Sequence, residues 1–354
     1  MKKNVLVVIF VFLASATVFS QKKGNTVVVK QCLDSIVSTD GYKTVFSYDS
    51  NGNKISNISY RWNKTTNDWV WKNKFEYTYD NNGNTTMGIN LWGGTMEDNK
   101  YEIAYDSNNK ETTVFNYEWN SVTKNWAVYE KSEYTYDNNG MASIEITYRF
   151  DKEINSLERR FKTEYTHENN SKTRIGYVWE QEINNWRIYS KSECFYDNNG
   201  NLTIRISYRW DNAINDWIFD SKFEATYDNN GNRTTGIEYD FRQKETNDWL
   251  ISYKHEYNYD NRGNLTIDTY YDWDKKTKSW EWKRKTEYEF YPFYSQKDLI
   301  MPARQYVGEN MLIKESNYKW SKTDWVEDEI TTYYWSEKKQ KNVQSKRNHK
   351  TASK

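Results

Sequence analysis

Tyr77-Thr78-Tyr79-Asp80-Asn81-Asn82-Gly83-Asn84 is the stretch that decides the fold, because close variants of it return along almost the whole chain. With Tyr79 as the anchor, the equivalent positions are Tyr48, Tyr79, Tyr105, Tyr136, His167, Tyr196, Tyr227, Tyr259 and Phe290. The intervals between them run from 26 to 32 residues, and five of the eight are 31. A fixed period predicts one supersecondary unit stacked on copies of itself.

Side chains alternate in character through the residues that lead to this turn. The aromatic set on one parity is Trp69, Trp71, Phe75, Tyr77 and Tyr79. Polar residues hold the other parity, which predicts a half-buried β-strand with one aromatic face. In the turn itself, Asp favours the first position of a type I turn and Gly supplies the positive φ that follows. The predicted structural turn residues are Asp80, Gly83, Asp137, Gly140, Asp197, Gly200, Asp228, Gly231, Asp260 and Gly263.

A second strand follows each turn. Apolar residues stand at every second position from 202 to 210, and a polar loop at 211–216 leads to the next long strand. Each period is thus a pair of antiparallel strands. We predict an all-β fold in which tandem β-hairpin repeats of about 31 residues form a long antiparallel meander. The meander would be a curved or spiral, solenoid-like sheet of roughly 18 strands, whose exposed end strands invite self-association.

The two faces of this sheet differ. Lys and Glu stand two residues apart just before the anchor in eight copies, which predicts a solvated outer face where repeated cross-strand ion pairs set the register. The opposite parity carries polar residues in mid-strand, such as Asn73, Glu130, Ser132 and Arg284. Burying these side chains unpaired would cost about 1–3 kcal/mol each. We therefore expect that face to line a hydrated interior or to stay partly open as a concave surface.

Composition excludes several classes of function. The 50 basic and 50 acidic residues leave no net charge, which argues against a nucleic-acid partner. With 3 histidines, of which His167 and His255 replace residues of the repeat, we expect no metal, no cofactor and no histidine-dependent catalytic triad. Cys32 and Cys194 lie about five repeats apart. A disulfide between them would need the array to fold back, so we expect Cys194 to be a small buried side chain.

The repeat and its interruptions predict the organisation of the chain. Residues 1–20 have the charged start, apolar run and cleavage point of a secretory signal. An N-terminal cap at 21–47 and an irregular last repeat or C-terminal cap at 291–335 flank the repeat array at 48–290. The basic residues 336–354 are expected to be disordered. We therefore expect a secreted protein, or one in the periplasm or on the outer surface.

The segment Tyr-x-Tyr-Asp-x-x-Gly-Asn at residues 77–84 resembles the YD repeat of RHS-like proteins and of small secreted bacterial repeat proteins. The resemblance covers most of residues 40–290. It implies β-hairpins wound into a spiral sheet or shell, with roles in cell-surface contact, carbohydrate binding or the enclosure of a toxin. The period here is longer, and neither the proline-containing motif that closes large shells nor a toxin domain follows. Only the hairpin architecture is therefore expected to carry over.

Tryptophan pairs are the candidate binding residues. Two Trp bracket the longer loop in five copies, namely Trp62 with Trp69, Trp119 with Trp126, Trp179 with Trp186, Trp210 with Trp217, and Trp273 with Trp280. Such a pair suits a cross-strand aromatic clasp, which we favour. It also suits a row of platforms for sugar rings or for a partner protein, and the two roles are compatible.

We predict a secreted or cell-surface scaffold that binds a glycan or a protein partner, is not an enzyme and does not span a membrane after signal removal. One alternative is a carbohydrate-active enzyme with a carboxylate pair, although the Glu residues recur in register with Lys. A second alternative is an outer-membrane β-barrel, although an Arg at the bilayer centre costs about 2–4 kcal/mol. The ligand, the oligomeric state and the role of the tail stay open.

Overall fold

The computed structural model describes residues 27–93, 98–241, 248–301 and 308–341. The predicted signal segment lies outside these residues. The strands are β1 (Val27–Ser38), β2 (Tyr42–Tyr48), β3 (Lys54–Asn63), β4 (Asp68–Tyr79), β5 (Thr85–Trp92), β6 (Asn99–Tyr105), β7 (Glu111–Asn120), β8 (Asn125–Tyr136), β9 (Ala142–Asp151), β10 (Ser156–Glu168), β11 (Ser171–Glu180), β12 (Asn185–Tyr196), β13 (Leu202–Asp211), β14 (Asp216–Tyr227), β15 (Arg233–Phe241), β16 (Trp249–Tyr259), β17 (Leu265–Asp274), β18 (Ser279–Ser295), β19 (Leu299–Ile300), β20 (Asn310–Trp320) and β21 (Trp325–Lys341). One short 3₁₀ helix, η1 (Gln296–Asp298), precedes β19.

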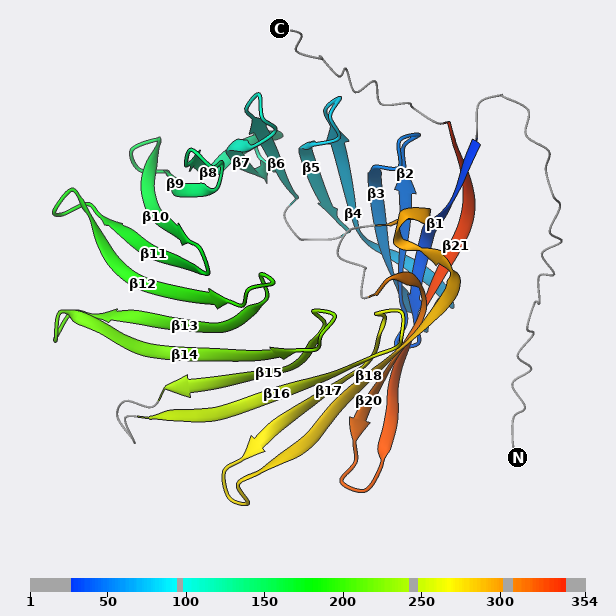
Figure 1. Cartoon of the computed structure of the whole chain (residues 1–354). Helices are drawn as coiled ribbons and strands as arrows, with labels where there is room; N and C mark the ends of the chain where they lie inside the picture. The colour runs from blue at the N-terminus through cyan, green and yellow to red at the C-terminus, as the bar shows by residue number, and fades with distance from the viewer. Residues whose placement is uncertain (1–26, 94–97, 242–247, 302–307, 342–354) are drawn as a thin grey trace, which may run out of the picture.

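Twenty of these strands close into one antiparallel β-barrel. Successive strands pair from β1 to β18, then β18 pairs with β20 and β20 with β21. The ring closes where β21 pairs with β1, from Val27 opposite Lys341 to Ser38 opposite Thr331. Figure 1 shows the strands arranged around this ring, with β1 beside β21.

The predicted open, curved or spiral sheet is therefore wrong, although the all-β class and the antiparallel hairpins hold. An open meander leaves two edge strands with unpaired backbone groups, and their mutual pairing removes both edges at once. The segments predicted as caps supply strands of the ring. Residues 336–341, expected to belong to a disordered tail, are the end of β21, and the rest of that tail lies outside the described residues.

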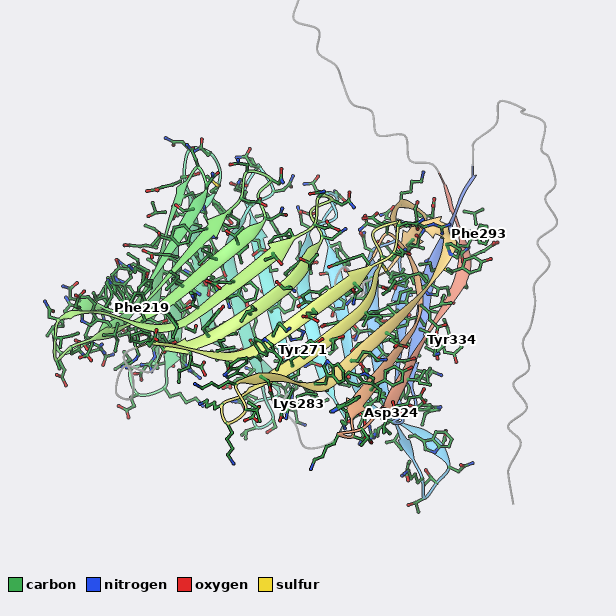
Figure 2. All side chains as sticks on the ribbon, turned by 60° about the horizontal axis from the view of Figure 1, so that its bottom comes forward. Phe219, Tyr271, Lys283, Phe293, Asp324 and Tyr334 are labelled. Atoms are coloured by element: carbon green, nitrogen blue, oxygen red, sulfur yellow. The ribbon has the colours of Figure 1, made fainter. Side chains whose placement is uncertain are left out.

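Each Asp-x-x-Gly segment forms a tight turn at the same rim. After β4, the N–H of Gly83 donates to the carbonyl of Asp80, and the N–H groups of Asn82 and Asn84 donate to the Asp80 carboxylate. Gly83 has a φ of +87°, which only glycine adopts without strain. The loops between tryptophans lie at the opposite rim. Figure 2 views the barrel from the side, with Phe293 near the tight-turn rim and Asp324 at the loop rim.

A β-bulge in the long strands decides which residues share a face. In the β3–β4 pair, Ser59 lies opposite Asn73 and Tyr60 opposite Trp71, so Lys72 is the extra residue. Trp71 therefore lies on the face opposite to Phe75, whereas strict alternation predicted one shared face. That prediction was wrong because a bulge shifts the alternation of side chains by one residue. Equivalent shifts occur in β8, β12, β14, β16 and β18.

Two pockets identify the inner face. One extends over β1 to β4 and β21, and the other over β16 to β18, β20 and β21. Both are lined mainly by side chains of the face that carries Phe75, Tyr77 and His255. Only the concave side of a barrel lets side chains of so many successive strands enclose one space. The Phe75 face therefore lines the lumen, and the face with the Trp pairs and the Lys–Glu pairs is the outer one.

The packed core is small and lies at the tight-turn rim beside the closure. Cys32, Leu33, Leu299, Ile300 and Leu312 are buried there, and β19 pairs in parallel with β1. A round barrel of twenty strands would be about 40 Å across, from a spacing of about 4.8 Å and a tilt of about 40°. Barrels of this strand number enclose a channel rather than a core filled by side chains.

Candidate functional site

The outer face carries the side chains that recur from copy to copy of the repeat. All eight predicted Lys–Glu pairs form ion pairs, with Nζ to Oε1 distances of 2.5 to 3.0 Å. Each of these pairs joins two residues of one strand, so the prediction that they connect neighbouring strands was wrong. The contacts of these pairs with neighbouring strands are made to aromatic residues. Lys191 Nζ lies 4.1 Å from the ring centroid of Tyr208 and 5.7 Å from that of Trp217, and Tyr208 donates a 2.7 Å hydrogen bond to Glu193.

The five predicted tryptophan pairs belong to this outer face at the loop rim. Their ring centroids lie 5.0 to 5.3 Å apart with interplanar angles of 69° to 80°. Edge-to-face contact between register partners is the geometry of a cross-strand clasp. The pairs are Trp62 with Trp69, Trp119 with Trp126, Trp179 with Trp186, Trp210 with Trp217, and Trp273 with Trp280.

The second member of each pair also meets a lysine that lies two strands earlier. The five half-buried rings with this contact are Trp69, Trp126, Trp186, Trp217 and Trp280. Their centroids lie 5.0 to 5.8 Å from the lysine Nζ. A ring held by a tryptophan and a lysine has less free surface for a ligand than an isolated platform would have.

The predicted ligand-binding tryptophans and the lumen pockets are thus different parts of the molecule. None of the ten side chains, Trp126, Trp186 and Trp280 included, lines either lumen pocket. One of the ten, Trp179, does line a further pocket of about 550 Å³ at the loop rim, beside Arg159 and Glu180. The other predicted tryptophans line none of the three pockets. A binding role for the exposed ring faces of these tryptophans stays a prediction.

Hydrogen bonding within the outer face shifts the ionisation of its members. Hydrogen bonds from Lys100 and Tyr117 lower the pKa of Glu102, and those from Lys131 and Tyr148 lower the pKa of Glu133. Burial and the bond to Glu102 raise the pKa of Tyr117 to about 12. The two carboxyls are thus kept charged and the Tyr117 hydroxyl is kept neutral, which are the forms that make these hydrogen bonds.

The lumen wall carries side chains that differ from one copy of the repeat to the next. Four residues before the anchor, the wall holds in turn Phe75, Tyr101, Ser132, Thr163, Ser192, Phe223, His255 and Thr286. Positions kept in every copy stack the repeats on each other. Positions that vary do not make these stacking contacts in every copy, so a specialised site is expected among them. His255 had been interpreted as a variant residue of the repeat, and the variation at this position was the signal for the site around it.

The most elaborate group of lumen side chains surrounds His255. We define the His255 pocket by Tyr253, His255, Asp268, Tyr270, Arg284 and Asn317, which enclose about 610 Å³ together with their neighbours. His255 Nδ1 lies 2.8 Å from Asp268 Oδ1. The His255 ring centroid lies 5.1 Å from that of Tyr270 and 6.1 Å from that of Tyr253. The pocket thus combines ring faces with a carboxylate, an amide and a guanidinium.

Polar contacts fix the orientation of the pocket side chains. The hydroxyl of Tyr270 donates to Asp272 Oδ1 at 2.6 Å, and the Arg284 guanidinium lies 5.1 Å from the Tyr270 ring centroid. Burial and the bond to Asp272 raise the pKa of Tyr270 to about 12. On the neighbouring β15, burial raises the pKa of Glu238, and Arg205 at 3.5 Å opposes this only in part. The wall beside the pocket is therefore a poor place for further negative charge.

A second pocket lies nearer the tight-turn rim. We define the Phe75 pocket by Phe46, Asn57, Phe75, Tyr77, Met301 and Tyr333, which enclose about 830 Å³ with their neighbours. The Phe75 and Tyr77 rings are parallel within 9°. Lys54 Nζ lies 4.4 Å from the Tyr77 ring centroid, and burial raises the pKa of Tyr77 to about 12.

Beside this pocket are two amide oxygens without partners. Asn73 Oδ1 and Asn90 Oδ1 are the buried side-chain polar atoms of the described residues that make no hydrogen bond. Asn73 is the register partner of Ser59, and Asn90 that of Phe75, so both lie on the lumen face. An unmet buried acceptor costs free energy and calls for an explanation.

Other chemistry is limited in the part of the chain that the structure describes. Within residues 27–341 and outside their gaps, no group of His, Cys, Asp and Glu side chains could hold a metal ion. Cys32 and Cys194 are free, and burial raises the pKa of Cys32 to about 11. The described segments contain no helix that is long and apolar enough to cross a membrane.

Fold and pockets together define a closed antiparallel β-barrel with an aromatic and polar lumen. No protein-family model matches the sequence, and no curated protein matches it. Solved structures give distant similarity. A protein of unknown function from Bacteroides fragilis is 18% identical with a TM-score of 0.34, over 36% of this chain and 91% of that one. A porin-like protein from Bacteroides uniformis is 10% identical with a TM-score of 0.29, over 86% and 98%.

The structure of TcdB2-TccC3 with Cdc42 is 12% identical with a TM-score of 0.29, over 84% of this chain and 17% of that one. The distant similarity to this RHS-like shell is the coarse part of the resemblance predicted from the YD repeat. Similarity at this level carries no inference about function, which has to come from the pockets.

Proposed function

We propose that this protein is an exported barrel that binds carbohydrate in its lumen without acting on it chemically. The His255 pocket supports the proposal best. A sugar ring has apolar C–H faces that pack against aromatic rings, and hydroxyls that hydrogen-bond to carboxylates, amides and guanidinium groups. The pocket offers both kinds of partner on one wall, and its volume is in the range of small-ligand sites.

Binding of a glycan panel, followed by calorimetry, tests this function. Tyr270→Ala and Asp268→Asn should each weaken binding about tenfold, which corresponds to the loss of about 1.4 kcal/mol of contact. Glu145→Gln is the matched control for Asp268→Asn, because Glu145 holds the position of Asp268 in β9 and lines neither pocket. Capture of a protein ligand instead of a glycan, or hydrolysis of a bound glycan, would contradict the proposal.

Export is part of the same proposal and rests on the predicted signal at residues 1–20. The predicted location is the cell envelope or beyond it. Fractionation of cells that produce the full chain would test this, and retention in the cytoplasm would contradict it.

An outer-membrane barrel is the second candidate. Its support is the closed, even-numbered antiparallel ring, in which the described ends of β1 and β21 lie at the rim of the shortest turns. The eight Lys–Glu pairs on the outer face oppose it. A Lys at the bilayer midplane costs about 2–4 kcal/mol, and a lipid-facing band about 25 Å tall would have to cover these pairs. We therefore favour a hydrated exterior, and a requirement for detergent during purification would reverse that preference.

A further inference from the structure

The two lumen pockets are connected along the wall by one carboxylate. Tyr333 lines the Phe75 pocket, and its hydroxyl donates a hydrogen bond of 3.2 Å to Glu315 Oε2. Asn317 lines the His255 pocket, and its Nδ2 donates a bond of 3.3 Å to Glu315 Oε1. Glu315 therefore touches a side chain of each pocket.

The pockets are also offset along the direction of the strands. Asn317 on β20 lies opposite Glu329 on β21, and Tyr333 is four residues further along β21 toward the tight-turn rim. At about 3.4 Å per residue, this offset is about 14 Å. Aromatic side chains mark both ends, with Tyr270 in one pocket and Tyr77 in the other.

We propose that the two pockets are the halves of one binding track, and that its ligand is a linear oligosaccharide rather than a single sugar. The inference rests on the proposed carbohydrate binding and adds the form of the ligand. Rings at each end take sugar faces, and Glu315 accepts hydrogen bonds from hydroxyls of the units between them. One chain that occupies both halves gains affinity, because its second contact is intramolecular.

Calorimetry on the full-length protein with short and long members of one series tests the track. The probes are cellobiose against cellohexaose and xylobiose against xylohexaose. In the series that binds, the long member should bind at least about tenfold more tightly than the short one. Tyr77→Ala and Glu315→Gln should remove most of this advantage of length. Tyr134→Ala is the matched control, because Tyr134 holds the position of Tyr77 in β8 and lines neither pocket.

The outcomes separate the track from the single pocket. Equal affinity for short and long members, with both still weakened by Tyr270→Ala, would overturn the track and leave the proposed function standing. An advantage of length that survives both Tyr77→Ala and Glu315→Gln would also overturn it. If the wild-type protein bound neither series nor any other glycan, the track and the proposed function would fall together. A melting curve of each variant distinguishes lost binding from lost folding, and Glu315→Gln keeps the shape of the side chain.

Discussion

Trp210 and Trp217 meet edge to face at the loop rim, with ring centroids 5.1 Å apart and an interplanar angle of 80°. They are direct register partners across the β13–β14 hairpin. The Nζ of Lys191, which lies on the preceding strand β12, is 5.7 Å from the Trp217 ring centroid. One aromatic pair thus joins three strands, and equivalents of it recur around the barrel.

We expect Trp217→Ala to lower the free energy of unfolding by about 2–3 kcal/mol, because a half-buried aromatic contact and a cation–π contact are lost together. Trp210→Phe should cost less than about 1 kcal/mol. The β15–β16 hairpin already uses a Phe in this place, where Phe241 and Trp249 meet with centroids 5.1 Å apart. Thermal or denaturant unfolding measures both. Weaker ligand binding at unchanged stability would instead assign Trp217 to a binding platform.

The outer face also predicts how stability depends on pH. Lowered pKa values of Glu102 and Glu133 mean that their contribution is present above the ordinary value of 4.5 and is lost as the pH falls through the folded value. The raised pKa of Tyr117 means that its contribution is present below 10 and is lost as the pH rises toward about 12. The melting temperature should therefore fall both in acid, below about pH 4.5, and in alkali, above about pH 10. The double variant with Glu102→Gln and Glu133→Gln should fall less steeply in acid, and an unchanged acid limb would contradict this account.

The hairpins were predictable because their signals are local. Asp80 and Gly83 fix a turn within four residues, and Lys and Glu two apart mark a strand face. The phase of the aromatic residues was not predictable, because nothing in the sequence around Lys72 distinguishes a bulged strand from a regular one. A single extra residue moved Trp71 to the outer face and left Phe75 in the lumen.

Closure of the ring and the pockets depend on contacts between distant residues. Ser38 and Thr331 are register partners although almost the whole described chain separates them. A repeat pattern does not predict that the first and last strands pair. The His255 pocket needs Asp268 and Asn317 from other strands, and their proximity follows only from the register. The sequence did show that one lumen position varies between copies, and His255 at that position had been interpreted as a variant residue of the repeat.

Asn264 and Asn310 fasten the segment after β18 to the tight-turn rim. Asn264 Nδ2 donates to Asn310 Oδ1 at 3.0 Å, and the Asn310 N–H donates to Asn264 Oδ1 at 2.8 Å. Asn264→Ala should cost about 2–3 kcal/mol, because it leaves buried partners unsatisfied. Asn232→Ala is the control, since the Asn232 side chain bonds locally to Asp228 of its own turn, and should cost about 1 kcal/mol. Equal losses of melting temperature would show that Asn310 contributes nothing.

The unsatisfied amide of Asn90 predicts a gain of stability on substitution. Asn90→Leu removes a buried acceptor without a partner at nearly the same volume, so the free energy of unfolding should rise by about 1–2 kcal/mol. Asn116→Leu is the matched control on the same face. Its Nδ2 lies 3.2 Å from Glu130 Oε1, so the loss of that bond should destabilise the barrel. A decrease for Asn90→Leu would mean that its amide has a structural partner.

The closed ring itself predicts a cross-link between the two ends of the described chain. Val37 and Thr332 are register partners in β1 and β21. Opposed Cβ atoms lie about 4.5–5.5 Å apart, and a disulfide needs about 3.8 Å, a difference that small backbone shifts absorb. Val37→Cys with Thr332→Cys, made with Cys194→Ser, should therefore oxidise readily. It should stabilise the fold by about 5 kcal/mol, because it closes a very long loop in the unfolded chain. Mass spectrometry of proteolytic fragments detects the link, and Val37→Cys with Ser143→Cys on β9 is the unlinked control. An open sheet would hold residues 37 and 332 far apart, so the absence of the cross-link in the folded protein would refute closure.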